Sequence, residues 1–207
     1  MFAFSIRTVV SGGAIALFLI SCTDSTAPSG TPASVRIVSG DAQTGAAGQK
    51  LSTPPRFIVE DANGRAVSNA HFTVTVAAGS GAIADVPGKT SGGPTSVGTW
   101  TLGQRVGADT LTVAVDGLAP LVVTATATAG PAAAITTTSP TTLSGRVGEA
   151  PANVPHVRVT DAFGNPLSSA QIHLSLSGGG SVSSAITTNA NGEADITDWA
   201  FSTTSGA

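Results

Sequence analysis

The sequence repeats itself at an offset of about 100 residues. Residues 55–64, PRFIVEDANG, match residues 155–164, PHVRVTDAFG, and Trp100 and Trp199 fall at matching places. A solenoid repeat is about 20–50 residues long, so a period near 100 has the length of a whole domain. The chain therefore has to build one kind of unit twice, and we expect two domains of the same fold.

Apolar and polar residues alternate within each copy. Residues 72–76, 111–115 and 172–176 each place apolar side chains at every second position. A period of two is typical of strands with one buried face. Residues 61–64 and 161–164, Asp-Ala-Asn-Gly and Asp-Ala-Phe-Gly, follow such runs and are predicted to be turns. Short strands between Gly- and Pro-rich turns indicate an all-β protein built from β-sandwiches.

Three further features of the sequence carry structural predictions. Trp100 and Trp199 are expected to be the large core anchors of their copies, because they are equivalent in the repeat. Asn191-Gly192 predicts a hairpin turn, since both residue types tolerate positive φ. Residues 86–93 form the longest candidate loop and carry one charge and no aromatic residue.

The N-terminal residues resemble a targeting signal. Arg7 precedes an apolar run at residues 9–20, which as a helix would span about 18 Å, too short for a bilayer core of roughly 30 Å. Such a run suits the apolar region of a signal peptide. It ends in Leu19-Ile20-Ser21-Cys22, which resembles the lipobox of bacterial lipoproteins. That resemblance implies removal of residues 1–21 and a diacylglyceryl thioether on Cys22.

A lipidated Cys22 makes the membrane the first expected partner, because two or more acyl chains hold a protein stably on a bilayer. The alternative is that Cys22 is an ordinary free thiol. Thr23 stands where an aspartate would favour inner-membrane retention in such lipoproteins, so the resemblance implies an outer-membrane or cell-surface location. Residues 22–31 are expected to comprise the lipidated cysteine and a flexible tether rich in Ser, Thr, Pro, Ala and Gly.

Motifs in both copies resemble those of bacterial immunoglobulin-like domains of the invasin/intimin type (group 1). The matching residues are Asp61, Gly64, Phe72, Gly79, Gly81, Trp100-Thr101-Leu102-Gly103, Gly107 and Thr110-Leu111-Thr112 in the first copy, and Asp161, Gly164-Asn165-Pro166, Thr188, Gly192, Ala194 and Trp199 in the second. The resemblance implies tandem immunoglobulin-like β-sandwiches at residues 32–129 and 130–207, here called the first and second repeats. Domains of this kind serve as spacers in surface adhesins.

The second repeat is shorter than the first. Gly206-Ala207 align with Gly107-Ala108, whereas the first repeat continues through further apolar runs at residues 111–115 and 121–123. We therefore expect the second sandwich to be incomplete at its C-terminus. Our hypothesis is that the chain is the N-terminal piece of a longer protein or a truncated gene product.

Composition narrows the function classes. Nine Lys+Arg against 12 Asp+Glu leave a net charge of −3, which argues against nucleic-acid binding because that needs a basic surface. One cysteine excludes an internal disulfide and a Cys-rich zinc site. His71, His156 and His173 lack the spacing of a metal site, and Asp195 and Asp198 have no obvious partner. We find no catalytic group and no cofactor motif, and expect no enzyme.

The leading functional hypothesis is a non-enzymatic cell-surface lipoprotein that acts as a structural stalk or adhesion module. The alternative is a module that binds a surface protein or polysaccharide through its sandwich-end loops. A third hypothesis is an enzyme whose catalytic part lies beyond Ala207. Because one fold supports many functions, the sandwich alone does not decide between them.

Overall fold

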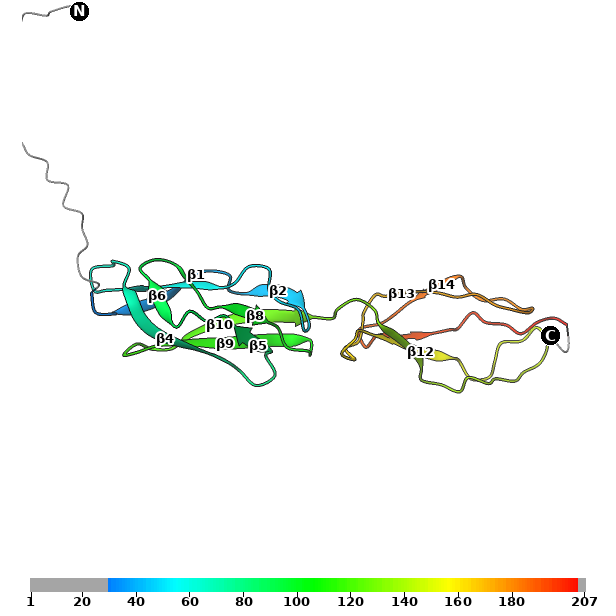
Figure 1. Ribbon diagram of the computed structural model, residues 1–207. Coiled ribbons are helices and arrows are strands. Elements are labelled where there is room, and N and C mark those ends of the chain that lie inside the picture. Colours follow the sequence, from blue (N-terminus) through cyan, green and yellow to red (C-terminus); the bar gives the residue numbers. More distant parts are fainter. Residues whose placement is uncertain (1–29, 205–207) are drawn as a thin grey trace, which may run out of the picture.

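A computed structural model describes residues 30–204, and every regular element among them is a β-strand (Figure 1). The predicted signal peptide at 1–21, the lipidation site Cys22 and most of the predicted tether at 22–31 lie outside the described residues. In the described part of the chain, no helix is long and apolar enough to cross a membrane. The expected all-β class is confirmed.

The first repeat contains ten strands arranged in three sheets. They are β1 (Ser34–Ser39), β2 (Gln43–Ala46), β3 (Arg56–Glu60), β4 (Ser68–Val76), β5 (Ala82–Ala84), β6 (Lys89–Ser91), β7 (Thr95–Ser96), β8 (Thr99–Thr101), β9 (Gly107–Val115) and β10 (Leu121–Thr128). The sheet orders are β1-β3-β7, β2-β10-β9-β4-β6 and β5-β8. The β2–β10 pair is parallel, and the other pairs of these sheets are antiparallel.

The core of the first repeat lies between these sheets. Phe72 begins the β4–β9 ladder opposite Val115, and its ring meets the edge of Phe57 from β3 with centroids 4.9 Å apart. Trp100 on β8 is completely buried, and its indole N–H donates to the carbonyl oxygen of Ser80 over 3.0 Å. The alternating runs at 72–76 and 111–115 are thus strands with one buried face, whereas the run at 172–176 is a strand only as far as His173. Trp100 is the core anchor that its position predicts.

The second repeat contains five strands, β11 (Ala134–Thr137), β12 (His156–Thr160), β13 (Gln171–His173), β14 (Ala185–Thr187) and β15 (Glu193–Asp195). They form two sheets, β11-β12-β15 and β13-β14, which correspond to β1-β3-β7 and β4-β6. Within residues 30–204, no strand of the second repeat corresponds to β2, β9 or β10. Trp199 is only half-buried and lies against Phe201, so it is less enclosed than its equivalence with Trp100 predicts.

Two predictions of local structure are also corrected. Asn191-Gly192 closes no hairpin, because β14 pairs with β13 and β15 pairs with β12. The turn instead carries the chain from one sheet to the other, and Gly192 N–H donates to the carbonyl oxygen of Asn189 over 3.0 Å. The candidate loop at 86–93 contains strand β6, which pairs with the edge of β4.

Candidate functional site: the joint between the repeats

The joint is built around the turn that follows β12. The Asp161 carboxylate accepts hydrogen bonds from the backbone N–H groups of Phe163 and Asn165, both over 2.9 Å. Gly164 N–H donates to the Asp161 carbonyl oxygen over 3.1 Å, and Gly164 has a φ of 83°. An aspartate that binds its own following backbone and a glycine at positive φ are what this turn requires. The predicted turn is confirmed.

The second carboxylate oxygen of Asp161 reaches beyond the turn. It accepts from the backbone N–H of Gly130, in the link between the repeats, over 3.0 Å, and from the side-chain amide of Asn165 over 2.8 Å. Burial by itself would raise the pKa of Asp161, which is 3% exposed. Hydrogen bonds from the Asn165 side chain and from the N–H groups of Gly130, Asn165 and Phe163 outweigh burial and lower this pKa to about 2.

Asn165 carries the contact from one repeat to the other. Its amide nitrogen donates to the Gln104 carbonyl oxygen over 2.8 Å, and its amide oxygen accepts from the Val106 N–H over 3.1 Å. Its side chain is therefore bonded on both polar atoms and is almost completely buried. Gln104 and Val106 lie in the loop between β8 and β9, and Asn165 lies in the turn after β12. These hydrogen bonds therefore connect a loop of the first repeat to this turn of the second repeat.

Phe163 adds an apolar contact to the same joint. Its ring lies so close to Gly48 that a Cβ on Gly48 would be 2.5 Å from the ring. Gly48 has a φ of 70°, so only glycine combines this backbone shape with room for the ring. Beside this contact lies an open groove of about 480 Å³, lined by both Phe163 and Arg105.

The first repeat holds its side of the joint through Asp109 on β9. This carboxylate is 4% exposed and accepts the backbone N–H of Gly103 over 2.7 Å. The Gly103 carbonyl oxygen in turn accepts the N–H of Gly48 over 2.9 Å. Asp109 is therefore a positioning residue that orders the loop to which Asn165 binds.

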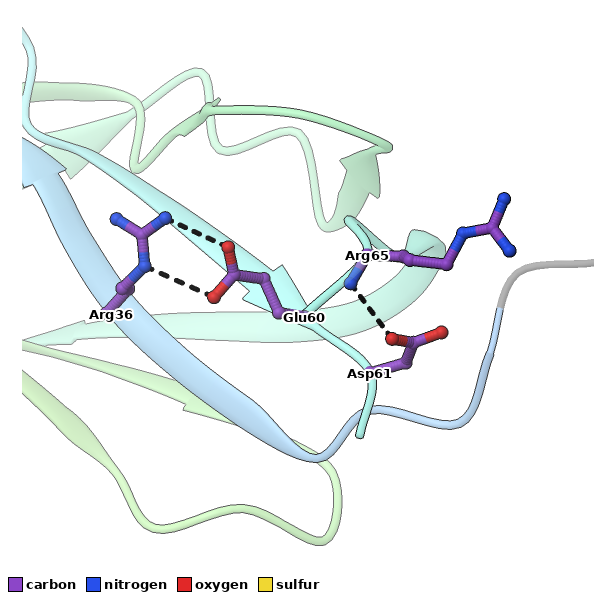
Figure 2. A network of polar contacts seen from close by, with 4 residues as sticks. All are labelled: Arg36, Glu60, Asp61 and Arg65. Atoms are coloured by element: carbon purple, nitrogen blue, oxygen red, sulfur yellow. Dashed lines mark hydrogen bonds and ion pairs between the residues drawn. The ribbon is translucent and has the colours of Figure 1, made fainter. Parts of the chain in front are cut away.

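The equivalent turn of the first repeat, after β3, lies beside a different set of polar contacts (Figure 2). Asp61 accepts from the N–H groups of Asn63 and Arg65, both over 2.9 Å, as in the second repeat. The neighbouring Glu60 instead receives two hydrogen bonds from the Arg36 guanidinium, over 3.2 and 2.9 Å. The Arg36 contact lowers the pKa of Glu60. Figure 2 shows these adjacent carboxylates directed to different partners, as expected for residues at a strand end.

The residues that sequence reasoning considered for chemistry lie apart from the joint. His156 and Asp195 form an exposed pair between β12 and β15, with Nδ1 and Oδ1 2.6 Å apart. Asp198 accepts from the Ser183 hydroxyl over 2.6 Å. Asp195 and Asp198, for which the sequence shows no obvious partner, therefore each have one in the structure. Among the described residues, no three His, Cys, Asp or Glu side chains gather closely enough to hold a metal ion.

Sequence reasoning did not identify Asn165 as a contact residue. The available signal was a difference between the copies, since Arg65 stands at the position of Asn165. It named Thr188 only as a motif residue and did not name Thr90. The buried hydroxyls of these two threonines donate to the carbonyl oxygens of Leu167 and Val67 and form the same contact in both repeats.

No protein-family model matches this chain, and the curated proteins contain no match. The resemblance to group 1 bacterial immunoglobulin-like domains therefore stays a prediction from motifs.

Two solved structures are similar to it. One is domains 4–9 of the surface layer protein SbsC, at 18% identity and a TM-score of 0.39, covering 81% of this chain. This chain spans 27% of that one. The other is the D0-D1 domain of intimin, at 15% identity and a TM-score of 0.30, covering 84% of this chain and 86% of that chain.

Proposed function

We propose that this chain is a non-enzymatic cell-surface lipoprotein that acts as a structural stalk or adhesion module. The observation that carries the proposal is the Asn165 bridge, in which one buried side chain is bonded both to its own turn and to the preceding repeat. A flexible link would leave each repeat to tumble by itself. A hydrogen-bonded joint instead holds the two repeats in one relative orientation, and a spacer needs such a fixed orientation to keep its far end away from its anchor.

The anchor end of the proposal rests on the lipobox-like residues that end in Cys22. A thioether-linked lipid there, followed by the polar residues up to Thr31, would hold the first repeat close to a membrane. Figure 1 shows the two repeats following one another along a single long direction, with their connection at the joint. The second repeat would then be the part presented away from the lipid.

The stalk role is tested by the distance between two spin labels, one in each repeat. Cysteines placed at the exposed positions Thr73 and Thr187, in residues 23–207, would be labelled and measured by double electron–electron resonance. A fixed joint gives one narrow distance distribution. A distribution as broad as that of a flexible linker would reject the stalk.

The anchor is tested separately by growing cells with an alkyne fatty acid. The wild-type chain and a Ser21→Ala control, which keeps a small residue before the cysteine, are expected to incorporate the label. Cys22→Ser is expected to lose it. Equal labelling of Cys22→Ser and wild type would reject lipidation at this site.

One observation favours the alternative role of binding a polysaccharide or a surface protein. The groove at the joint places Phe163, which is 43% exposed, beside Arg105. Aromatic residues and arginine are both enriched in the surfaces through which proteins bind one another. A glycan array and a pull-down with wild type and Arg105→Ala test this role, and a hit that is lost in the variant would support it.

A further inference from the structure

The turn between β9 and β10 carries a run of exposed apolar residues. Residues 118–122, Leu-Ala-Pro-Leu-Val, are all apolar, and none of them is buried. Val122 is 56% exposed. Single apolar side chains are common on protein surfaces, but an exposed run of this length needs a function to explain it. We call residues 118–122 the apolar tip.

The turn holds the apolar tip in one shape. Gly117 has a φ of 78°, and the Leu118 N–H donates to the Val115 carbonyl oxygen over 3.1 Å. Beside the tip lies an open hollow of about 300 Å³, lined by residues 33–35 at the start of β1 and by residues 118–121. Because the apolar surface is already ordered, binding through it does not have to order the chain first.

The apolar tip lies at the end of the first repeat away from the joint. Strand β9 begins at Gly107, directly after Val106 at the joint, and runs about 26 Å before it reaches the turn. The chain enters the first repeat at the same end as the tip, because Ala33 and Ser34 line the hollow beside it. Figure 1 shows this entry at the end opposite to the joint.

The distance along the chain to Cys22 decides which surface the apolar tip meets. Eleven positions separate Cys22 from Ala33, so even a fully extended chain keeps Ala33 within about 40 Å of a lipid on Cys22. A tether this short gives the parts that it joins an effective concentration on the order of 1 mM. A weak affinity of the tip for lipid is then enough to keep the two in contact.

We propose that the apolar tip inserts into the surface of the lipid bilayer to which Cys22 is anchored. This inference rests on the lipid anchor of the proposed function. The strength of such interfacial binding scales with the apolar area that enters the headgroup region. Asp116 is the one charged residue between β9 and β10, and it precedes the apolar run without interrupting it. The first repeat then has two attachments to the bilayer, the lipid and the tip, which together fix its direction.

The test anchors the chain artificially, so that its result does not depend on natural lipidation. Residues 22–207 are coupled through Cys22, the only cysteine, to a maleimide lipid in phosphatidylcholine vesicles. Amide exchange is compared with that of the same chain capped by a soluble maleimide and mixed with plain vesicles. We expect exchange at residues 117–122 to be at least about fivefold slower in the coupled chain, because amides withdrawn from water exchange only on opening. Exchange at residues 77–81, at the joint end, should not change.

A charge placed in the apolar tip provides the matched variant. Ala119→Asp is expected to abolish the slowing, because a carboxylate resists transfer out of water. Ala78→Asp, in an exposed turn at the joint end, is the control and should keep it. Equal exchange in the coupled and capped wild-type chains overturns the proposal, and so does slowing that survives in Ala119→Asp.

Two further results separate this inference from its neighbours. Slow exchange at residues 117–122 in the capped chain without vesicles overturns the proposal, since a second copy of the chain then covers the tip. Loss of the alkyne label in cells together with slow exchange in the coupled chain rejects the natural anchor and supports the affinity of the tip for lipid. The two failures are therefore distinguishable.

Discussion

The side-chain amide of Asn165 donates to the carbonyl oxygen of Gln104 over 2.8 Å, and this bond joins one repeat to the other. The same nitrogen lies 2.8 Å from the Asp161 carboxylate, so the bridging side chain is itself held in place by a charged acceptor. Hydrogen bonds to charged groups are stronger than those between neutral groups. The Asp161 carboxylate therefore orients the Asn165 side chain for its hydrogen bond to Gln104.

Replacing Asn165 by alanine is expected to loosen the joint and leave both repeats folded. The change removes the bonds to Gln104 and Val106, each worth about 0.5–1.5 kcal/mol. The distance distribution between labels at Thr73 and Thr187 should broaden. Asn63→Ala, in the equivalent exposed turn of the first repeat, is the control and should leave the distribution unchanged. A narrow distribution in Asn165→Ala would mean that other contacts set the geometry.

Gly48→Ala tests the apolar half of the joint. Gly48 and Gly148 both have positive φ, 70° and 76°, so alanine at either site should cost about 1 kcal/mol of backbone strain. At Gly48 the new Cβ also collides with the Phe163 ring, whereas at Gly148 the one neighbouring atom is a methyl of Thr203 at 3.8 Å. Solution scattering should show a changed angle between the repeats for Gly48→Ala alone. The same change in both variants would refute a specific role for the ring.

Some of this architecture could be predicted from sequence, and the rest depends on which neighbours each residue has. The strand at 72–76 could be predicted because the alternation of apolar and polar residues is a local pattern. The turn at Asp161 could also be predicted, because the residues that form it are adjacent in the sequence. The burial of Trp100 does not predict the same burial for Trp199. A tryptophan is buried by the strands around it, and within residues 30–204 the second repeat does not contain those that cover Trp100.

The joint was harder to predict for a different reason. The contact of Asn165 with Gln104 joins residues 61 positions apart in two different repeats. Nothing in the pattern of either repeat specifies how the two units meet. The copies do differ in this turn, since Asn63 stands at the position of Phe163 and Arg65 at the position of Asn165. They differ at several neighbouring positions as well, so the difference does not single out the contact residues.

The Asp161 carboxylate should make the joint sensitive to acid. Its pKa is lowered from 3.8 to about 2, so the folded state favours the charged form. Its contribution to stability is complete above about pH 4 and is lost as the pH falls through about 2. The free energy of unfolding of wild type minus that of Asp161→Asn should therefore shrink between these values. A difference that does not change with pH would show that the carboxylate charge contributes nothing.

Asp109→Ala should loosen the joint from the side of the first repeat. The change leaves the buried N–H of Gly103 without its acceptor, at a cost of about 1–3 kcal/mol. We expect amide exchange to speed up at Gly103 and Val106, and the spin-label distribution to broaden as it does for Asn165→Ala. Asp116→Ala, at an exposed turn of the same repeat, is the matched control. Fast exchange at Gly103 with an unchanged distribution would show that the joint does not depend on the order of this loop.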